Sequence, residues 1–109
     1  MKNKEIADIL QKMGTLLEIS GENIFKIKAY YKAAENIEAL AEPVEDIARD
    51  NRLAEIPGVG KAIEEKINEY LKSGKVSAYE KLIKEVPESV LELVEIPSVW
   101  GHRAGNPLA

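Results

Sequence analysis

The stretch that decides the fold reads Leu53-Ala-Glu-Ile-Pro-Gly-Val-Gly-Lys-Ala-Ile-Glu-Glu-Lys-Ile67. Pro57 and Gly58 suit the two central positions of a type II turn, because proline presets the first φ and glycine tolerates the positive φ of the second. After Gly60, apolar side chains recur four residues apart at Ile63 and Ile67, which indicates that a helix begins directly after the turn. The stretch therefore predicts a tight hairpin that leads into a helix.

Apolar residues outside this stretch recur with the spacing of further helices. We expect helices at residues 4–19, 24–40, 43–50, 61–72, 77–86 and 87–94, with a short apolar piece at 53–56. Asn3 is expected to cap the first helix. The inner faces are expected to carry Ile6, Ile9, Leu10, Met13, Leu16, Leu17, Ile24, Ile27, Tyr31, Ala34, Ile37, Tyr70, Leu71, Leu82 and Val86. No run alternates with a period of two, so the fold class is predicted to be all-α, a compact bundle of short helices.

The composition places the chain among small globular domains and excludes several kinds of site. It has 109 residues, of which 45% are hydrophobic and 31% charged, with a net charge of −4. Without cysteine and with one histidine, it offers no disulfide, no thiol nucleophile and no zinc site built on cysteines or several histidines. No run approaches the ~20 apolar residues of a membrane span. We expect a cytoplasmic protein, nucleoid-associated in a prokaryote, with an ordered domain at 1–97 and a flexible or non-native tail at 98–109.

The hairpin has a chemistry of its own. The backbone N–H groups from Gly58 to Lys61 are expected to be exposed and unpaired at the beginning of a helix. Such a terminus carries a partial positive charge and suits a phosphate oxygen, and glycine lets the phosphate approach closely. A plain corner between two helices that uses Pro-Gly for structural reasons is the alternative.

The motif Ile56-Pro-Gly-Val-Gly60 resembles the helix-hairpin-helix motif of sequence-independent DNA-binding proteins. Together with Phe25-Lys-Ile-Lys-Ala-Tyr-Tyr-Lys-Ala-Ala34 and Tyr70-Leu-Lys-Ser-Gly-Lys75, it makes residues 4–97 similar to the amino-terminal domain of family X DNA polymerases. The resemblance implies a domain that binds the 5′-phosphate side of gapped or nicked DNA in base excision repair. Its partner, if the chain is a fragment, would be a polymerase catalytic domain.

The resemblance also implies particular residues at this site. Phosphate contacts would come from Gly58, Val59, Gly60, Lys61, Lys26 and Tyr30. A bound Na⁺ or K⁺ would be held by the backbone carbonyls of Ala54, Ile56 and Val59. Residues 24–34 carry three lysines and no acid, whereas residues 35–55 carry seven acids, so we expect a local DNA site with few phosphate contacts.

Two other functions remain open from the sequence. In animal members of the family, a lysine at the position of Lys66 forms a Schiff base that removes a 5′-deoxyribose phosphate, so Lys66 is a candidate catalytic residue. Several supporting cations of those enzymes are replaced here, by Phe25, Ala54, Ala62 and Ala78. A lysine beside an apolar stripe can equally extend its stem over the core and keep its ammonium in water. A helical protein-interaction module is the third hypothesis.

The chain differs from the family in two respects, the residues needed for polymerase catalysis and the sequence near the carboxyl terminus. The three aspartates fall on expected helices, and none forms the strand-borne cluster that would bind the two metal ions of a polymerase. Ile96-Pro97 echoes Ile56-Pro57, but Ser98 follows where a second hairpin would continue with glycine. We therefore expect no polymerase activity from this chain by itself and no intact second hairpin.

Overall fold

The computed structural model describes residues 2–85, and within them it has five α-helices, one 3₁₀ turn and no strand. The elements are α1 (Asn3–Ile19), α2 (Ile24–Glu38), α3 (Val44–Arg49), η1 (Leu53–Glu55), α4 (Lys61–Ser73) and α5 (Ser77–Glu85). The all-α prediction is confirmed. The expected helix at 87–94, the expected break at Ser98 and the tail at 98–109 lie outside the described residues. None of the helices described is both long and apolar enough to cross a membrane.

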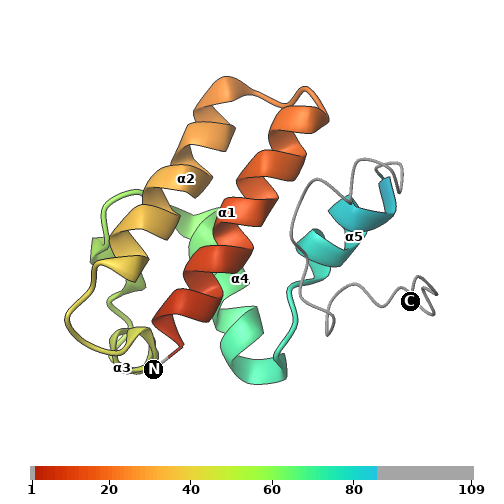
Figure 1. The fold of residues 1–109 in the computed structure, drawn as a ribbon. Helices are drawn as coiled ribbons and strands as arrows, with labels where there is room; N and C mark the ends of the chain where they lie inside the picture. The colour runs from red at the N-terminus through yellow and green to blue at the C-terminus, as the bar shows by residue number, and fades with distance from the viewer. Residues whose placement is uncertain (1, 86–109) are drawn as a thin grey trace.

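The first two helices form an antiparallel pair, against which the later helices of residues 2–85 lie (Figure 1). Gly14 allows α2 to come close, because a Cβ there would lie 2.8 Å from Cε1 of Tyr31. The Tyr31 hydroxyl donates a hydrogen bond to Oε1 of Glu18 at 2.9 Å. Tyr31 therefore packs across α1 at the surface and is only half-buried. The spacing of apolar residues predicts a core position for it instead.

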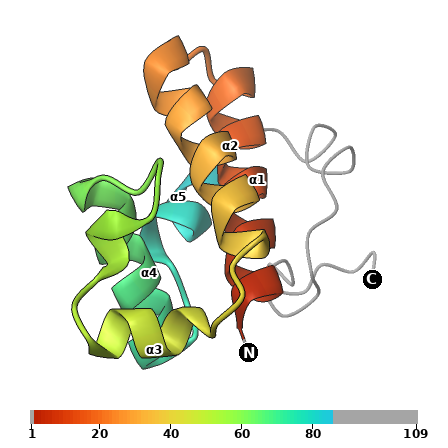
Figure 2. The same ribbon diagram turned by 90° about the vertical axis from the view of Figure 1, so that its left-hand side faces the viewer.

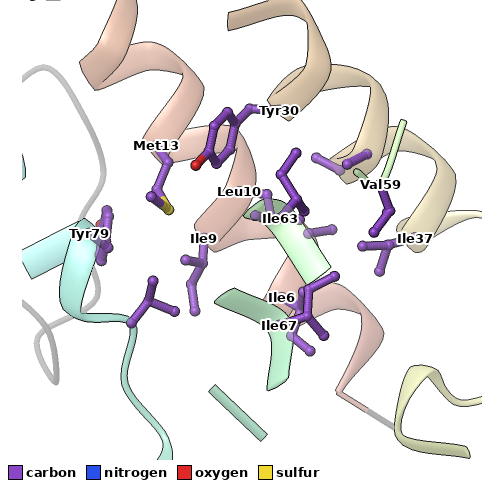
Figure 3. Packing of buried hydrophobic residues seen from close by; sticks show 14 of the residues in the cluster. Ile6, Ile9, Leu10, Met13, Tyr30, Ile37, Val59, Ile63, Ile67 and Tyr79 are labelled. Carbon is purple, nitrogen blue, oxygen red and sulfur yellow. The ribbon is translucent and has the colours of Figure 1, made fainter. Parts of the chain in front are cut away.

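The core lies where α4, with the hairpin before it, packs against this pair. Figure 3 shows Ile63 and Ile67 of α4 among side chains of α1, with Val59 beside Ile37 of α2. Ile56 and Val59 are each 5% exposed, so both arms of the hairpin are anchored by buried side chains. Burial of one such side chain stabilises a fold by about 1.5–3 kcal/mol. The hairpin is thus fixed to the core at two points.

The prediction that Asn3 caps its own helix is wrong. The Asn3 side chain is 5% exposed, and its Nδ2 donates to the Glu42 carbonyl at 2.9 Å. Its Oδ1 accepts from the N–H of Val44 at 2.9 Å, so Asn3 caps α3. Figures 1 and 2 both show the beginning of α1 beside α3. A buried polar side chain is stable here because both of its polar atoms have partners.

Two other inner-face predictions need correction. Ile24 is 52% exposed, because the chain turns into α2 at the far end of the helix pair from α4. On α5 the buried residues are Tyr79 and Ile83, one helical turn apart, whereas Leu82 is half-buried and Val86 lies outside the described residues. The face of α5 that packs on the core therefore includes Ile83, one residue along the helix from the expected Leu82.

Candidate nucleic-acid interface

The turn before α4 has the predicted type II form. The N–H of Val59 donates to the Ile56 carbonyl at 3.0 Å, and Gly58 has a φ of +90°. Proline cannot take a positive φ, so Pro57 followed by a left-handed Gly58 defines a type II turn. One expectation fails here, because the N–H of Val59 is used inside the turn and is not free for a ligand.

The neighbouring donors remain open. The N–H groups of Gly58, Gly60, Lys61 and Ala62 donate to no acceptor among residues 2–85, and no side chain there caps α4. Gly60, Lys61 and Ala62 are also exposed to solvent. The first N–H groups of α4 are thus unpaired where the α4 macrodipole places roughly half a positive charge.

The two glycines of the hairpin differ in what surrounds them. A Cβ on Gly58 would lie 2.9 Å from the backbone N of Ala33 and 3.1 Å from Cγ of Lys32. The turn therefore sits directly on the α2 backbone, and both this contact and the positive φ require glycine at position 58. A Cβ on Gly60 would meet no atom within 4 Å. Free space for an approaching ligand exists at Gly60, and the close approach at Gly58 is to the protein itself.

A further contact, from Asn36 on α2, holds the turn and was missed at the sequence level. Its Nδ2 donates to the carbonyl of Pro57 at 2.7 Å, across 21 residues of chain. The available signal was an asparagine directly before the core residue Ile37, because asparagine is unfavourable inside a helix without a specific partner. Its partner depends on the tertiary fold, so no local pattern identifies it.

Several basic side chains of α2 and α4 have no acidic partners in the part of the chain described. Lys26, Lys32 and Lys61 are exposed and form no ion pair there. The two arginines of the acidic segment are paired instead, Arg49 with Asp46, and Arg52 with Glu42 and Asp50. Positive charge on this surface is therefore available on the side of α2 and α4.

Tyr30 does not join these lysines. It is 3% exposed, and desolvation raises its pKa to about 12. Figure 3 shows its ring beside Met13 of α1, inside the helix pair. The structure thus places Tyr30 in the core and Lys26 at the surface, and it does not bring them together as one phosphate pocket.

Lys66 lies on the side of α4 that faces α1. With Ile6, Ile9, Leu10, Ile67, Tyr70 and Val76 it lines a cavity of about 10 Å³. Its Nζ donates a long hydrogen bond, 3.5 Å, to the Ala62 carbonyl, and the side chain is half-buried. The cavity is lined by apolar atoms, so it contacts the stem of Lys66, whereas the hydrogen bond of Nζ lies at the exposed surface.

The carbonyl groups expected to bind a monovalent cation have acceptor capacity to spare. Those of Ala54 and Val59 accept no hydrogen bond from residues 2–85. The carbonyl of Ile56 accepts one, from Val59, and keeps a second lone pair. Backbone carbonyls are suitable ligands for Na⁺ or K⁺. No cluster of acidic or histidine side chains that could bind a metal ion occurs within the described residues.

The comparisons with known proteins identify the family to which this hairpin belongs. Residues 1–76 match the model of the helix-hairpin-helix domain, so the chain belongs to that family. It is 33% identical, over 94% of its length, to DNA polymerase/3′-5′ exonuclease PolX of Bacillus subtilis (strain 168). It is 31% identical, over 91% of its length, to DNA polymerase lambda of Arabidopsis thaliana.

The chain spans 18% of the length of each of these relatives. The expected relation to family X DNA polymerases is confirmed for this domain. The chain is thus a helix-hairpin-helix DNA-binding domain related to those polymerases.

Proposed function

We propose that the domain binds the 5′-phosphate side of gapped or nicked DNA during base excision repair, with the phosphate at the beginning of α4. The observation that carries the proposal is the open space at Gly60 beside unpaired N–H groups. A phosphate oxygen there accepts from backbone donors and from the exposed Lys61. In a longer polymerase, the domain would hold the downstream end of the gap while a separate domain fills it.

A cation on the three carbonyls would complete this site. It would supply positive charge between carbonyl and phosphate oxygens, which otherwise repel each other. Ala54, Ile56 and Val59 provide the ligands, and the turn holds the last two together through the hydrogen bond from Val59 to Ile56. Comparing DNA binding in Na⁺, K⁺ and tetramethylammonium salts at equal ionic strength tests the cation, since tetramethylammonium is too large for such a site.

Phosphate recognition is tested with a duplex that has a one-nucleotide gap, with and without the 5′-phosphate, across a salt series. The wild-type protein should prefer the phosphorylated gap, and its affinity should fall steeply with salt, because each neutralised phosphate adds roughly −0.7 to −0.9 to the log–log slope. Gly60→Ala places a methyl group in the open space and should reduce the preference.

Gly74→Ala is the matched control. Gly74 also has open space around it, and it ends α4 about 20 Å from Gly60, from the rise per residue of a helix. With a φ of +77° at Gly74, this variant loses some stability without touching the hairpin. Equal affinity for the two gapped duplexes, or an equal loss in both variants, would contradict the proposal.

A lyase reaction through Lys66 has narrower support. The stem of Lys66 packs among apolar side chains, which is compatible with a nucleophilic amine, but the Nζ hydrogen bond lies at the exposed surface, where desolvation of the amine is small. Borohydride trapping on DNA that carries a 5′-deoxyribose phosphate tests this function. A covalent adduct that is absent in Lys66→Ala would establish it, and no adduct with the wild-type protein would exclude it.

A further inference from the structure

The hydrogen bond from Asn36 does more than anchor a loop, because it fixes the orientation of one peptide group in the hairpin. We propose that Asn36 is a positioning residue that holds the Pro57–Gly58 peptide with its carbonyl toward α2 and its N–H toward the phosphate. This proposal rests on the proposed function for the phosphate, but the peptide orientation itself does not depend on it.

The planarity of the peptide bond determines the direction of the Gly58 N–H once the direction of the Pro57 carbonyl is known. In a trans peptide the C=O and the N–H point in opposite directions. Asn36 on α2 donates to the Pro57 carbonyl at 2.7 Å, so that carbonyl points toward α2. The N–H of Gly58, in the same peptide unit, must therefore point away from α2. It donates to no acceptor within residues 2–85, which agrees with an outward direction.

The competing conformation is a type I turn formed by the same four residues. Type I and type II turns differ by a rotation of the central peptide through about 180°, and Pro at the first central position is compatible with both. Gly58 can take either sign of φ at little cost. Pro57-Gly58 favours the type II form but is compatible with both, so an interaction from outside the turn decides how fully the type II form is populated.

The chemical consequence of a flip is a reversal of charge at the ligand side. In the type I form the Pro57 carbonyl oxygen faces outward in place of the Gly58 N–H, and it repels a phosphate oxygen. The hydrogen bond from Asn36 disfavours that form, because the carbonyl would lose its partner. Asn36 thereby preorganises the hairpin for an anion without touching the ligand itself.

Asn36→Leu keeps a side chain of similar size and removes the donor. In this variant, three-bond HN–Hα couplings and residual dipolar couplings should show Gly58 populating negative φ. The preference for the 5′-phosphate should fall roughly tenfold, as for the loss of one charge-assisted hydrogen bond. Asn68→Leu is the matched control, since Asn68 is also half-buried in a helix and makes no side-chain hydrogen bond with residues 2–85.

The outcomes separate this inference from the proposed function. A variant with wild-type couplings at Gly58 overturns the role of Asn36, whether or not DNA binding changes. A wild-type protein without any phosphate preference contradicts the proposed function, and the couplings still decide the peptide orientation. If Asn36→Leu does not fold, the wild-type protein suffices. A scalar coupling across the hydrogen bond, from Nδ2 of Asn36 to the carbonyl carbon of Pro57, must then be present, and its absence overturns the inference.

Discussion

The two glycines of the hairpin should respond very differently to the same substitution. Gly58→Ala forces a side chain into a left-handed conformation, which costs about 1–2 kcal/mol. It also brings a Cβ to 2.9 Å from the backbone N of Ala33, and relief of that contact requires the turn to move off α2. Such a movement breaks the hydrogen bond from Asn36 to Pro57, a loss of about 1 kcal/mol.

The free energy of unfolding should therefore fall by about 2–3 kcal/mol in Gly58→Ala. For a domain of this size, that lowers Tm by roughly 10–20 °C. Gly60→Ala should change stability by no more than about 0.5 kcal/mol. Its φ of −89° suits any residue, no atom is near, and a poorer N-cap is offset by a less flexible unfolded chain.

Urea unfolding followed by far-ultraviolet circular dichroism measures both variants. Midpoints that are equal in the two variants would refute the argument that the absence of a side chain serves the fold at Gly58 and the ligand at Gly60. A Gly60→Ala protein that is strongly destabilised would refute it as well, because a structural role for Gly60 would then explain any loss of DNA binding.

Three other predictions concern residues farther from the turn. Asn3→Ala should destabilise the protein by about 2–3 kcal/mol in urea unfolding, because it leaves the N–H of Val44 and the carbonyl of Glu42 unpaired near the core. A loss below about 1 kcal/mol would show that water replaces the side chain. Phe25→Ala should leave stability unchanged, because Phe25 is 77% exposed. It should weaken binding to gapped DNA, because Phe25 lies next to a lysine and stacking on a base contributes roughly 1–3 kcal/mol. An unchanged Kd would contradict this. The raised pKa of Tyr30, about 12 against about 10 unfolded, contributes stability that is complete below pH 10 and is lost as pH rises toward 12. The unfolding midpoint should fall over that range, and less steeply in Tyr30→Phe, with tyrosinate absorbance as the second readout.

Most of the fold could be predicted because its signals are local. The period of apolar residues located the helices, and Pro57-Gly58 specified the turn type, which Gly58 confirms with its φ of +90°. Asn3 was assigned to the wrong helix because its partners, Glu42 and Val44, are about forty residues away. A capping preference identifies the residue type that caps a helix but does not say which helix it will cap.

The site was predictable in outline but not in its division of roles. The motif located the hairpin, but the functions of its glycines depend on α2, which no local pattern brings into contact with it. The position of Tyr30 was not predicted correctly. The spacing placed Tyr31, and not Tyr30, on the inner face of α2, and the resemblance assigned Tyr30 to the phosphate pocket, whereas the structure buries Tyr30. Neither signal identified Tyr30 as a core residue, because its burial depends on how closely α1 packs against α2.

The buried side chains of Ile56 and Val59 have a consequence for experiments on backbone dynamics. They anchor the hairpin to the core, while the N–H groups of Gly60 and Lys61 have no protein acceptor among residues 2–85 and lie in solvent. In amide hydrogen exchange these two groups should lose their protons almost as fast as in an unfolded chain, although the backbone around them stays ordered. Rapid exchange there would reflect missing acceptors and not local opening, and protection on addition of DNA would report a new acceptor without any change of fold.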